Sequence, residues 1–427
     1  MAAREFDIVI FGATGFTGQY VFEELARLSK TENVKFALAA RSENKLKSVI
    51  EKSKEYLQSV GEPINADIPI IIADISDENS LLEMCKKTKV LLNCVGPYNL
   101  FGECVVKACL TAKTHHLDVS AESLFLEGMQ LKYHEEAIQK GVYIIGACGF
   151  DSIPCDLGVS LVKKKFQGDL NSVETYLEFN SGPQGETFNA GTWNSMVYGI
   201  ITMNKTKEIR KQLNKTVFKK SPNFSHRLSK RPVVFKSDIT NKWCVPFPGS
   251  DKTVTLRSQL FNYNYKNERP VQIQTYFVTS LFNLFFILLM GMMLLIFSRF
   301  KYGRKLLVSY PHLFSFGKFK EGGPSRQEIK EASFTTVFWA EGWKDKLDVD
   351  KQHTEPPNKN MKVTLTAPDA AYITTAFCIV NAGVVCLKEN EKMPGSGGVL
   401  TPAAAFEDTS LLERLQKSGM EFSIIEK

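Results

Sequence analysis

The feature that most constrains the fold is a glycine-rich loop that follows a short apolar strand near the N-terminus. Residues 8–11 form a continuous apolar run, as expected for a parallel strand that is covered on both faces. The loop at residues 12–18 follows, and Val21, Leu25 and Leu28 then recur with helical spacing. A Gly-x-x-Gly-x-x-Gly loop between a strand and a helix predicts a dinucleotide-binding turn.

Each glycine of this loop has its own role in the predicted turn. The first permits the tight turn, the second lets the backbone approach a pyrophosphate, and the third allows the helix to pack closely on the strand. The phosphates would lie at the helix N-terminus, where free N–H groups and the helix dipole favour negative charge. The alternative is a glycine-rich turn that serves packing alone. The dinucleotide interpretation assigns six loop residues to the cofactor: Gly12, Thr14, Gly15, Phe16, Thr17 and Gly18.

The second predicted strand indicates which dinucleotide fits. NAD-binding enzymes place Asp or Glu about 20 residues after the loop to hold the ribose 2′-hydroxyl. Here the corresponding stretch, residues 39–42, has no carboxylate. Arg41 can hold a 2′-phosphate with two hydrogen bonds or stack on the adenine, with Ser42 beside it, whereas its alternative is an ordinary surface position. NADP(H) is therefore favoured over NAD(H).

Further cofactor contacts are predicted at the ends of the third and fourth strands. Asp74 ends the third strand and can bind the adenine amino group, or it can cap the helix that starts near Ser76. Val95 and Gly96 end the fourth strand, at the carboxyl edge where ligands bind in open α/β sheets. We therefore include Asp74, Val95 and Gly96 in the predicted cofactor site.

The alternation of patterns along the chain predicts the fold class. Residues 7–155 alternate between strand and helix, which indicates right-handed βαβ units and a parallel sheet. Beyond them, strand-like runs are expected at 173–180, 253–265, 333–343 and 361–367, and helices at 368–387 and 402–418, with a loop at 395–398. The predicted class is α/β: an N-terminal Rossmann domain with a parallel sheet, plus a second α+β domain with a mostly antiparallel or mixed sheet.

The predicted domain boundaries follow from the same patterns. The Rossmann domain covers 1–155, and the substrate domain is split into 156–270 and 306–400 by an apolar membrane-associating insertion at 271–305. A C-terminal helix and tail, 401–427, is expected to pack back on the Rossmann domain.

The apolar insertion contains a run, 271–298, without a charged residue. A run of this length can form a helix that crosses a hydrocarbon core of about 30 Å. Crossing would place the two parts of the substrate domain on opposite sides of the membrane, so we expect a segment that enters one leaflet and returns. Its turn is expected near Asn283 or Gly291. Basic residues flank the run and would lie on anionic head groups: Arg269, Arg299, Lys301, Arg304 and Lys305.

The formal net charge of +7 is concentrated in one stretch. Residues 205–236 contain eleven Lys or Arg and one acidic residue, Glu208, so this stretch carries +10 and the remainder −3. Such a block predicts an anionic partner surface, membrane or nucleic acid, or else a solvated loop. The neighbouring apolar run favours a membrane, and we expect no nucleic acid.

Cysteine spacing and the first residues bear on metals and on compartment. Nine scattered cysteines without a Cys-x-x-Cys pair predict reduced thiols and no metal site. Residues 1–7 are short and charged ahead of the first strand, so we expect no secretory signal.

The sequence shows neither a Tyr-x-x-x-Lys pair near the predicted site nor a Cys–His dyad. Hydride transfer needs a proton donor within reach of the substrate. The catalytic candidates are the side chains that follow the fourth, fifth and sixth strands: Tyr98, Glu122 and Asp151. Glu122 and Asp151 have helix capping or turn formation as alternatives. Trp193, from the second domain, can wall the pocket or belong to the core.

Four further motifs and the glycine loop together resemble one family. They are Cys-Val-Gly-Pro-Tyr at 94–98, Asp-Val-Ser-Ala-Glu at 118–122, Gly-Phe-Asp-Ser-Ile-Pro at 149–154 and Gly-Gly-Val-Leu-Thr-Pro at 397–402. Over essentially its whole length the chain resembles the saccharopine dehydrogenase-like oxidoreductases. The resemblance implies a Rossmann domain with a substrate domain, oxidoreductase activity, and association with lipid droplets and membranes. The glycine loop and the apolar segment depart from the lysine-pathway enzymes, which puts saccharopine in doubt as the substrate.

The resulting hypothesis is an NADP(H)-dependent oxidoreductase of lipid metabolism. It would act on a lipid or acyl substrate at the cytosolic face of a lipid droplet or of the endoplasmic reticulum. Its expected partners are the phospholipid surface and a small-molecule substrate, and a homo-oligomer is left open. The alternatives are a cofactor-binding lipid-droplet or membrane protein with little or no turnover, and, third, a true saccharopine dehydrogenase.

Overall fold

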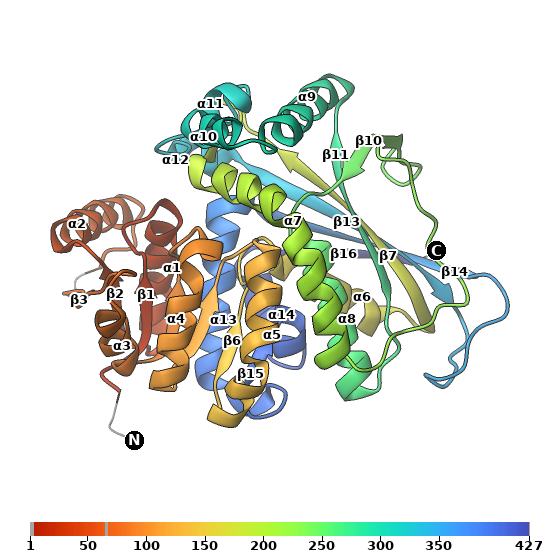
Figure 1. Cartoon of the computed structure of the whole chain (residues 1–427), viewed down its shortest axis with the longest axis horizontal. Coiled ribbons are helices and arrows are strands. Elements are labelled where there is room, and N and C mark those ends of the chain that lie inside the picture. The colour runs from red at the N-terminus through yellow and green to blue at the C-terminus, as the bar shows by residue number, and fades with distance from the viewer. Residues whose placement is uncertain (1–3, 65–66, 427) are drawn as a thin grey trace.

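The computed structural model describes residues 4–64 and 67–426, and it contains two seven-stranded sheets (Figure 1). Residues 1–3, the start of the charged segment considered above for a secretory signal, lie outside the described residues. The first sheet has the order β15-β6-β5-β4-β1-β2-β3, and all of its pairs are parallel, as predicted. Its strands are β1 (Phe6–Phe11), β2 (Phe36–Ala40), β3 (Ile70–Ile72), β4 (Thr88–Asn93), β5 (His115–Asp118), β6 (Tyr143–Ile145) and β15 (Gly398–Leu400).

Helices cover both faces of the first sheet, which explains why residues 8–11 of β1 and the whole of β2 are apolar. Alternate residues of β1 enter different hydrophobic clusters: Ile8 and Ile10 in one, Val9 and Phe11 in the other. The first cluster includes α1 (Phe16–Glu32), α2 (Glu43–Ser59) and α13 (Thr375–Lys388). The second includes α3 (Glu78–Lys86), α4 (Tyr98–Ala112) and α5 (Ser123–Lys140).

The C-terminal part of the chain completes the first sheet. The strand β15 pairs with β6, with Val399 opposite Ile144, and α13 packs on α1 and β4. The predicted division at residue 400 therefore does not describe the layers, because β15 fills the open edge of β6. Gly398, which was expected in a loop, is the first residue of this strand.

The second sheet is mixed, with the order β16-β14-β13-β7-β11-β10-β9. Only β7 and β11 run parallel, and the other pairs are antiparallel. The predicted strands at 173–180, 333–343 and 361–367 are confirmed in β7, β13 and β14. The strands are β7 (Asp169–Asn180), β9 (Phe235–Lys236), β10 (Trp243–Pro246), β11 (Gln272–Thr279), β13 (Ser333–Trp343), β14 (Lys359–Pro368) and β16 (Glu421–Glu426).

The strand predicted at 253–265 is wrong, because this stretch is the helix α8 (Asp251–Phe261) followed by a π-helical turn. Its β-branched residues favour a strand, but Val254, Ser258 and Phe261 recur with helical spacing and are buried. The helix packs on α6 (Ile153–Lys165) and α14 (Pro402–Phe406). The single C-terminal helix expected at 402–418 is two helices, α14 and α15 (Leu411–Lys417).

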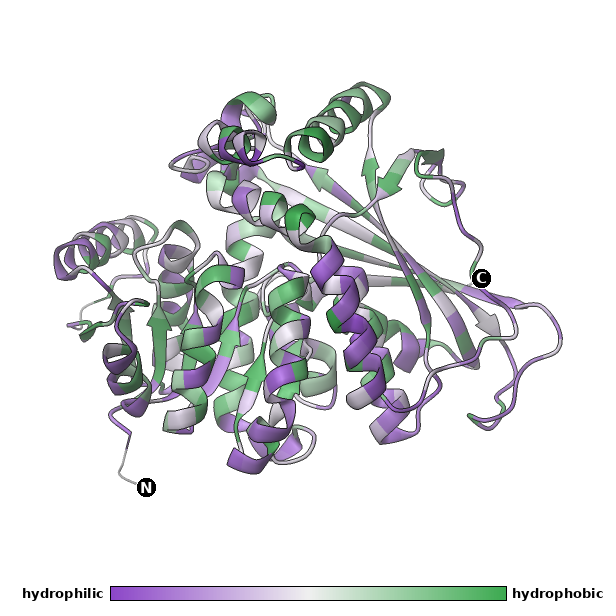
Figure 2. Ribbon diagram, in the orientation of Figure 1, coloured by the Kyte–Doolittle hydropathy of each residue, from purple (hydrophilic) through white to green (hydrophobic). Residues whose placement is uncertain are grey.

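The apolar run divides between the sheet and the surface. Its first part is β11, and its second part is the helix α9 (Leu281–Phe297). This helix is unbroken, so the turns expected near Asn283 or Gly291 are wrong, and its 17 residues span about 25 Å. It is followed by α10 (Lys301–Ser309) and α11 (Pro311–Phe314), and Figure 2 shows α9 as a hydrophobic helix at the top of the molecule.

One helical stretch, Ala370–Lys388, is long and apolar enough to cross a membrane, but 83% of its apolar window is buried inside the protein. It contains α13 and contributes to the core of the first sheet.

The long helix α7 (Ala190–Thr216) connects the apolar surface helices with the first domain. It packs along α5 and contacts α9, α10 and α11. At its N-terminal side, β8 (Phe188–Asn189) pairs with β12 (Phe319–Lys320), which leads to the short helix α12 (Arg326–Glu331). In Figure 1 these elements lie above the upper edge of the first sheet, where the predicted site residues end their strands.

Candidate functional site

The glycine loop joins β1 to α1 and has little room for side chains. Gly12 has φ +90°, and its N–H donates to the Ala39 carbonyl oxygen at 2.9 Å. A Cβ on Gly18 would lie 2.2 Å from the Gly12 carbonyl oxygen, so only glycine allows this approach of helix and strand. Gly15 precedes the first turn of α1 without a side-chain cap. This bare backbone at a helix N-terminus fits a pyrophosphate group.

The corner beyond β2 contains the residues predicted to distinguish the two dinucleotides. Arg41 is exposed directly after β2, and the Ser42 hydroxyl accepts the Lys45 N–H at 3.4 Å, which caps α2. The Asp74 carboxylate accepts hydrogen bonds from the Ser76 N–H at 2.9 Å and from its hydroxyl at 2.8 Å. These bonds, with a smaller effect of Arg41, lower the pKa of Asp74. Asp74 therefore shares this corner with Arg41.

Residues after β4 lie against the glycine loop. The Val95 N–H donates to the Asn93 side-chain oxygen at 3.0 Å, which fixes the turn that leaves the strand. A Cβ on Gly12 would lie 2.7 Å from Val95 Cγ2. Gly96 follows and is exposed. The ends of β1 and β4 thus form one continuous backbone surface at the carboxyl edge of the sheet, where dinucleotides bind in this class of fold.

Glu122 connects three elements at this edge. It is 2% exposed, and its carboxylate accepts the backbone N–H groups of Tyr98 at 2.9 Å and Asn99 at 2.8 Å. The Ser195 hydroxyl of α7 donates to the same carboxylate at 3.0 Å. A buried acceptor here satisfies free N–H groups in the first turn of α4. Glu122 makes no side-chain cap to α5, which was its predicted structural alternative.

The Tyr98 side chain is held inside the protein. Its hydroxyl donates to the Asn93 carbonyl oxygen at 2.9 Å, and its ring lies 5.6 Å from that of Phe125. Burial raises the pKa of Tyr98 well above its ordinary value. The phenol is therefore neutral and already engaged, with 7% of the residue exposed.

The structure places Asp151 beside a second carboxyl group that the sequence interpretation missed. Burial raises the pKa of Asp151 to about 6, and burial with the charge of Asp151 raises the pKa of Asp251 well above its ordinary value. The hydroxyls of Ser152 and Ser250, their chain neighbours, are 2.9 Å apart. The strand predicted at 253–265 gives no reason to single out Asp251, which is the first residue of the helix α8. The turn Pro248-Gly249-Ser250 followed by an acidic residue is a helix-start signal that could have identified it.

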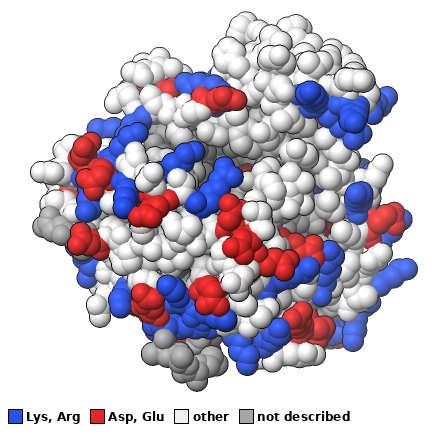
Figure 3. Space-filling view, turned by 60° about the vertical axis from the view of Figure 1, so that its left-hand side comes forward, with Lys and Arg blue, Asp and Glu red and all other residues white. Residues whose placement is uncertain are grey.

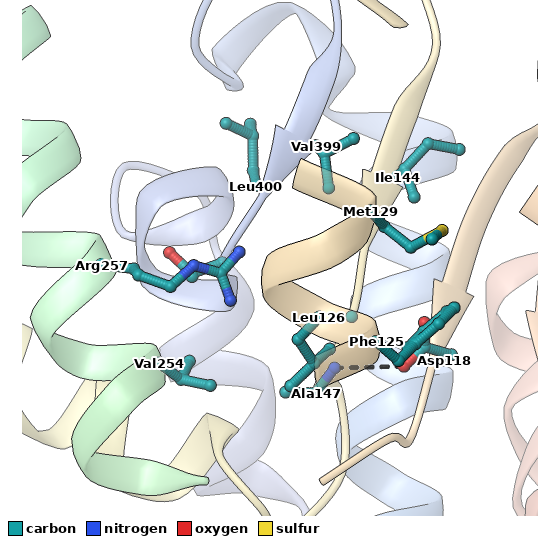
Figure 4. Close-up of a pocket in the computed structure, with 12 residues that line it drawn as sticks. Asp118, Phe125, Leu126, Met129, Ile144, Ala147, Val254, Arg257, Val399 and Leu400 are labelled. Atoms are coloured by element: carbon teal, nitrogen blue, oxygen red, sulfur yellow. Dashed lines mark hydrogen bonds between the residues drawn. The ribbon is translucent and has the colours of Figure 1, made fainter. Parts of the chain in front are cut away.

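A small cavity lies between α5, α8 and the ends of β5 and β6 (Figure 4). Its volume of about 10 Å³ is that of a single water site, too small for a substrate. Asp118 lines it and accepts the Ala147 N–H at 3.3 Å, and burial raises the pKa of Asp118 to about 7. Arg257 lines it from α8, and burial lowers the pKa of this guanidinium to about 10. Neither residue was predicted from the sequence.

Trp193 packs away from the carboxyl edge of the first sheet, in the core position that was its alternative. It is fully buried, and its indole N–H donates to the Leu307 carbonyl oxygen of α10 at 2.8 Å. It belongs to a hydrophobic cluster with Leu294 and Phe314 of the surface helices. Ser195, two residues further along α7, contacts the first domain through Glu122.

The second domain also touches the glycine loop directly. A Cβ on Gly323 would lie 2.8 Å from the Phe16 ring, which itself lies 4.7 Å from the ring of Tyr372. Arg326 of α12 forms two hydrogen bonds to the Glu23 carboxylate of α1, at 2.6 and 3.0 Å. We call the glycine loop and the carboxyl ends of β2, β4 and β5 the dinucleotide edge. These contacts place it between the two domains.

Comparisons with known proteins agree with this geometry. The model of the saccharopine dehydrogenase NADP binding domain matches residues 8–145. The human saccharopine dehydrogenase-like oxidoreductase is 41% identical, over 99% of this chain and 98% of that protein. The lipid droplet localized protein of Caenorhabditis elegans is 38% identical over 98% of each.

A solved structure supports the fold as a whole. Saccharopine dehydrogenase (L-Glu forming) from Saccharomyces cerevisiae matches with a TM-score of 0.55, over 98% of this chain and 100% of that chain, at 14% sequence identity. That identity shows the fold alone. The family domain and the absence of a carboxylate from residues 39–42 both favour NADP(H), which supplies or accepts a hydride when bound. By its full-length relatives and its dinucleotide domain, the chain belongs to the saccharopine dehydrogenase-like oxidoreductases, with an unproven substrate.

Proposed function

We propose that this chain is an NADP(H)-dependent oxidoreductase that acts on a lipid or acyl substrate at the surface of a lipid droplet or cytosol-facing membrane. One observation carries the proposal: the helices that follow β11 present large apolar side chains to solvent. Soluble monomers rarely expose a large apolar patch without an interaction partner. We call this surface the apolar platform; it consists of Leu281, Phe282, Phe285, Leu288, Met292, Leu295, Ile296, Phe300, Tyr302, Leu306, Tyr310, Leu313 and Phe316.

The length and charges of the platform fit a single leaflet. The helix α9 spans about 25 Å, less than a hydrocarbon core of about 30 Å. Figure 3 shows the uncharged mass at the top of the molecule with basic side chains beside it. Arg299 and Lys301 follow α9 directly and would meet anionic head groups when the apolar side chains enter the leaflet.

The platform is connected to the dinucleotide edge by one helix. Trp193 of α7 packs under the platform, and Ser195, two residues further, donates to Glu122 at the dinucleotide edge. A lipid bound at the platform therefore lies close to the end of the helix that faces the cofactor. The name of the Caenorhabditis elegans relative supports a droplet surface, and the 14% identity to the yeast enzyme gives no support for saccharopine as substrate.

A second candidate is a cofactor-binding surface protein without turnover. It is favoured by the two sequence-predicted catalytic side chains that are already engaged: the Tyr98 hydroxyl donates to a carbonyl oxygen, and the Glu122 carboxylate accepts three hydrogen bonds. Asp151, whose Oδ1 has no hydrogen-bond partner among the described residues, is the remaining candidate for a proton donor.

The experiment combines vesicle binding with turnover. Purified protein is incubated with NADPH and vesicles made from a lipid extract, and NADPH oxidation and product masses are followed. Replacing Phe282 and Phe285 by Glu should abolish both vesicle binding and turnover while NADPH binding is retained. Val233→Glu is the control, because Val233 is 69% exposed but lies outside the platform. If the wild-type protein binds vesicles but shows no turnover, the second candidate is favoured. If the Phe282/Phe285 variant still binds vesicles, the platform does not bind the lipid surface.

A further inference from the structure

Two asparagines at the dinucleotide edge have buried amide atoms without a hydrogen-bond partner among the described residues. They are Oδ1 and Nδ2 of Asn99, in the first turn of α4, and Oδ1 of Asn194, in the second turn of α7. Buried polar atoms in proteins are nearly always paired, because an unpaired one loses its bonds to water without replacement. Unpaired amides on two elements that bind the same carboxylate, Glu122, therefore point to a group that binds beside it.

Glu122 joins the two elements that carry these asparagines. Its Oε2 accepts the Asn99 backbone N–H at 2.8 Å, and its Oε1 accepts the hydroxyl of Ser195, the residue next to Asn194, at 3.0 Å. Asn99 and the chain neighbour of Asn194 thus contact one carboxylate at the interface of the two domains. Asn99 follows the carboxyl end of β4, on the side of the glycine loop opposite to β2.

This side of the loop is where the nicotinamide half of the dinucleotide extends. In this fold the pyrophosphate lies on α1 and the adenosine ribose at the end of β2. The other half of the molecule then reaches over β4 and β5.

The free amide atoms match a primary carboxamide in number and type. Two oxygens, Asn99 Oδ1 and Asn194 Oδ1, can accept, and one amino group, Asn99 Nδ2, can donate. A carboxamide has two N–H hydrogens to donate and one carbonyl oxygen to accept. A carboxylate has no hydrogen for the two oxygens and would add a charge beside Glu122, and a hydroxyl has only one hydrogen to donate. We propose that Asn99 and Asn194 form the subsite for the carboxamide of the nicotinamide ring.

The proposal rests on NADP(H) binding by the family domain and is independent of the lipid substrate and of turnover. Dissociation constants are measured for NADPH and for 2′-phospho-ADP-ribose, which lacks the nicotinamide ring, with Asn99→Leu and Asn194→Leu. Each variant should bind NADPH about tenfold more weakly, whereas its affinity for 2′-phospho-ADP-ribose should not change. Asn214→Leu is the control, because Asn214 is an exposed asparagine of the same helix as Asn194.

A second ligand tests the carboxamide itself. Wild-type protein should bind NADP⁺ more tightly than its 3-acetylpyridine analogue, which has a methyl group in place of the amide nitrogen. This preference should shrink in Asn194→Leu, which keeps one accepting oxygen, and should vanish when Asn99→Leu is added. Asn194→Ala repeats the test if the larger side chain prevents folding. Equal losses of affinity for NADPH and for 2′-phospho-ADP-ribose would show that the asparagines have a merely structural role. If neither ligand loses affinity, or if the variants still prefer NADP⁺ over its analogue as strongly as the wild type does, the two amides do not bind the carboxamide.

Discussion

Ser195 and Glu122, from different domains, are joined by a hydrogen bond of 3.0 Å from the Ser195 hydroxyl to the Glu122 carboxylate. The same carboxylate accepts the backbone N–H groups of Tyr98 and Asn99. One buried carboxyl group therefore joins the first turn of α4 to the N-terminal part of α7. This contact is one of several between the two domains, beside the Arg326–Glu23 pair.

Two substitutions that remove parts of this contact should lower the free energy of unfolding by different amounts. Ser195→Ala removes one hydrogen bond to a charged group at a half-buried position, so the free energy of unfolding should fall by about 1–2 kcal/mol. Glu122→Gln should cost more, about 2–3 kcal/mol, because an amide leaves one of the two N–H groups without an acceptor. Urea denaturation measures both, with the exposed Ser229→Ala as control. Equal and small effects would show that the contact carries no stability.

Gly18→Ala should weaken cofactor binding by displacing the backbone. The added methyl group would lie 2.2 Å from the Gly12 carbonyl oxygen, so helix and loop must separate. We expect NADPH to bind at least tenfold more weakly in calorimetry. Gly199→Ala is the matched control, because a Cβ there meets nothing within 4 Å. Unchanged affinity in Gly18→Ala would argue that the loop does not hold the pyrophosphate.

Arg41→Ala should separate the two dinucleotides. An arginine bound to a 2′-phosphate makes charge-assisted hydrogen bonds worth about 1.5–3 kcal/mol, which is roughly a tenfold to hundredfold change in affinity. NADPH should weaken by this factor, whereas NADH, which lacks the phosphate, should not change. Lys52→Ala, an exposed cation of α2, serves as the control for general charge effects. Equal losses for both cofactors would mean that Arg41 does not bind the phosphate.

Asp156 should make stability depend on pH. It is fully buried, its Oδ2 accepts the Ser258 hydroxyl at 2.7 Å, and burial raises its pKa to about 7. In the unfolded chain the pKa returns to about 4. Between these values the folded protein holds a proton that the unfolded chain has released, so the free energy of unfolding falls as the pH rises from 4 to 7.

Asp156→Asn removes this titration. The stability of the variant relative to wild type should therefore rise between pH 5 and 7, by at most about 1.4 kcal/mol per pH unit, and should level off above pH 7. Urea denaturation at several pH values measures the difference, with the exposed Asp350→Asn as control. A pH-independent difference would show that Asp156 is ionised in the folded protein throughout this range.

The first domain could be predicted because its signals are local. The apolar run, the glycine loop and the helical spacing of Val21 and Leu25 all lie within a few turns of one another, and they define β1 and α1. The same holds for β13, whose alternation over residues 333–343 is regular. Local patterns failed where two periodicities coincided: α8 has β-branched residues at its start, and its helical face became clear only from burial.

The candidate site was predictable only in part, because its contacts join distant parts of the chain. Strand ends identified Tyr98 and Glu122, but nothing near Glu122 in the sequence indicates that Ser195 donates to it. Asp251 lies near Asp151 although 100 residues separate them, and Asn99 is joined to Ser195, the neighbour of Asn194, only through Glu122. Pairings of this kind depend on how two domains are docked, which no local pattern encodes.

The late arrival of β15 has a consequence during synthesis on the ribosome. The first sheet is open beside β6 until residues 398–400 have been made, and α13, which covers one of its faces, is made only shortly before. At roughly 5–20 residues per second, translation from Ile145 to Gly398 takes on the order of ten seconds or more. In this interval the edge of β6 has no partner strand, and the apolar helix α9 is already synthesised. Both stay exposed to solvent until the C-terminal segment leaves the exit tunnel.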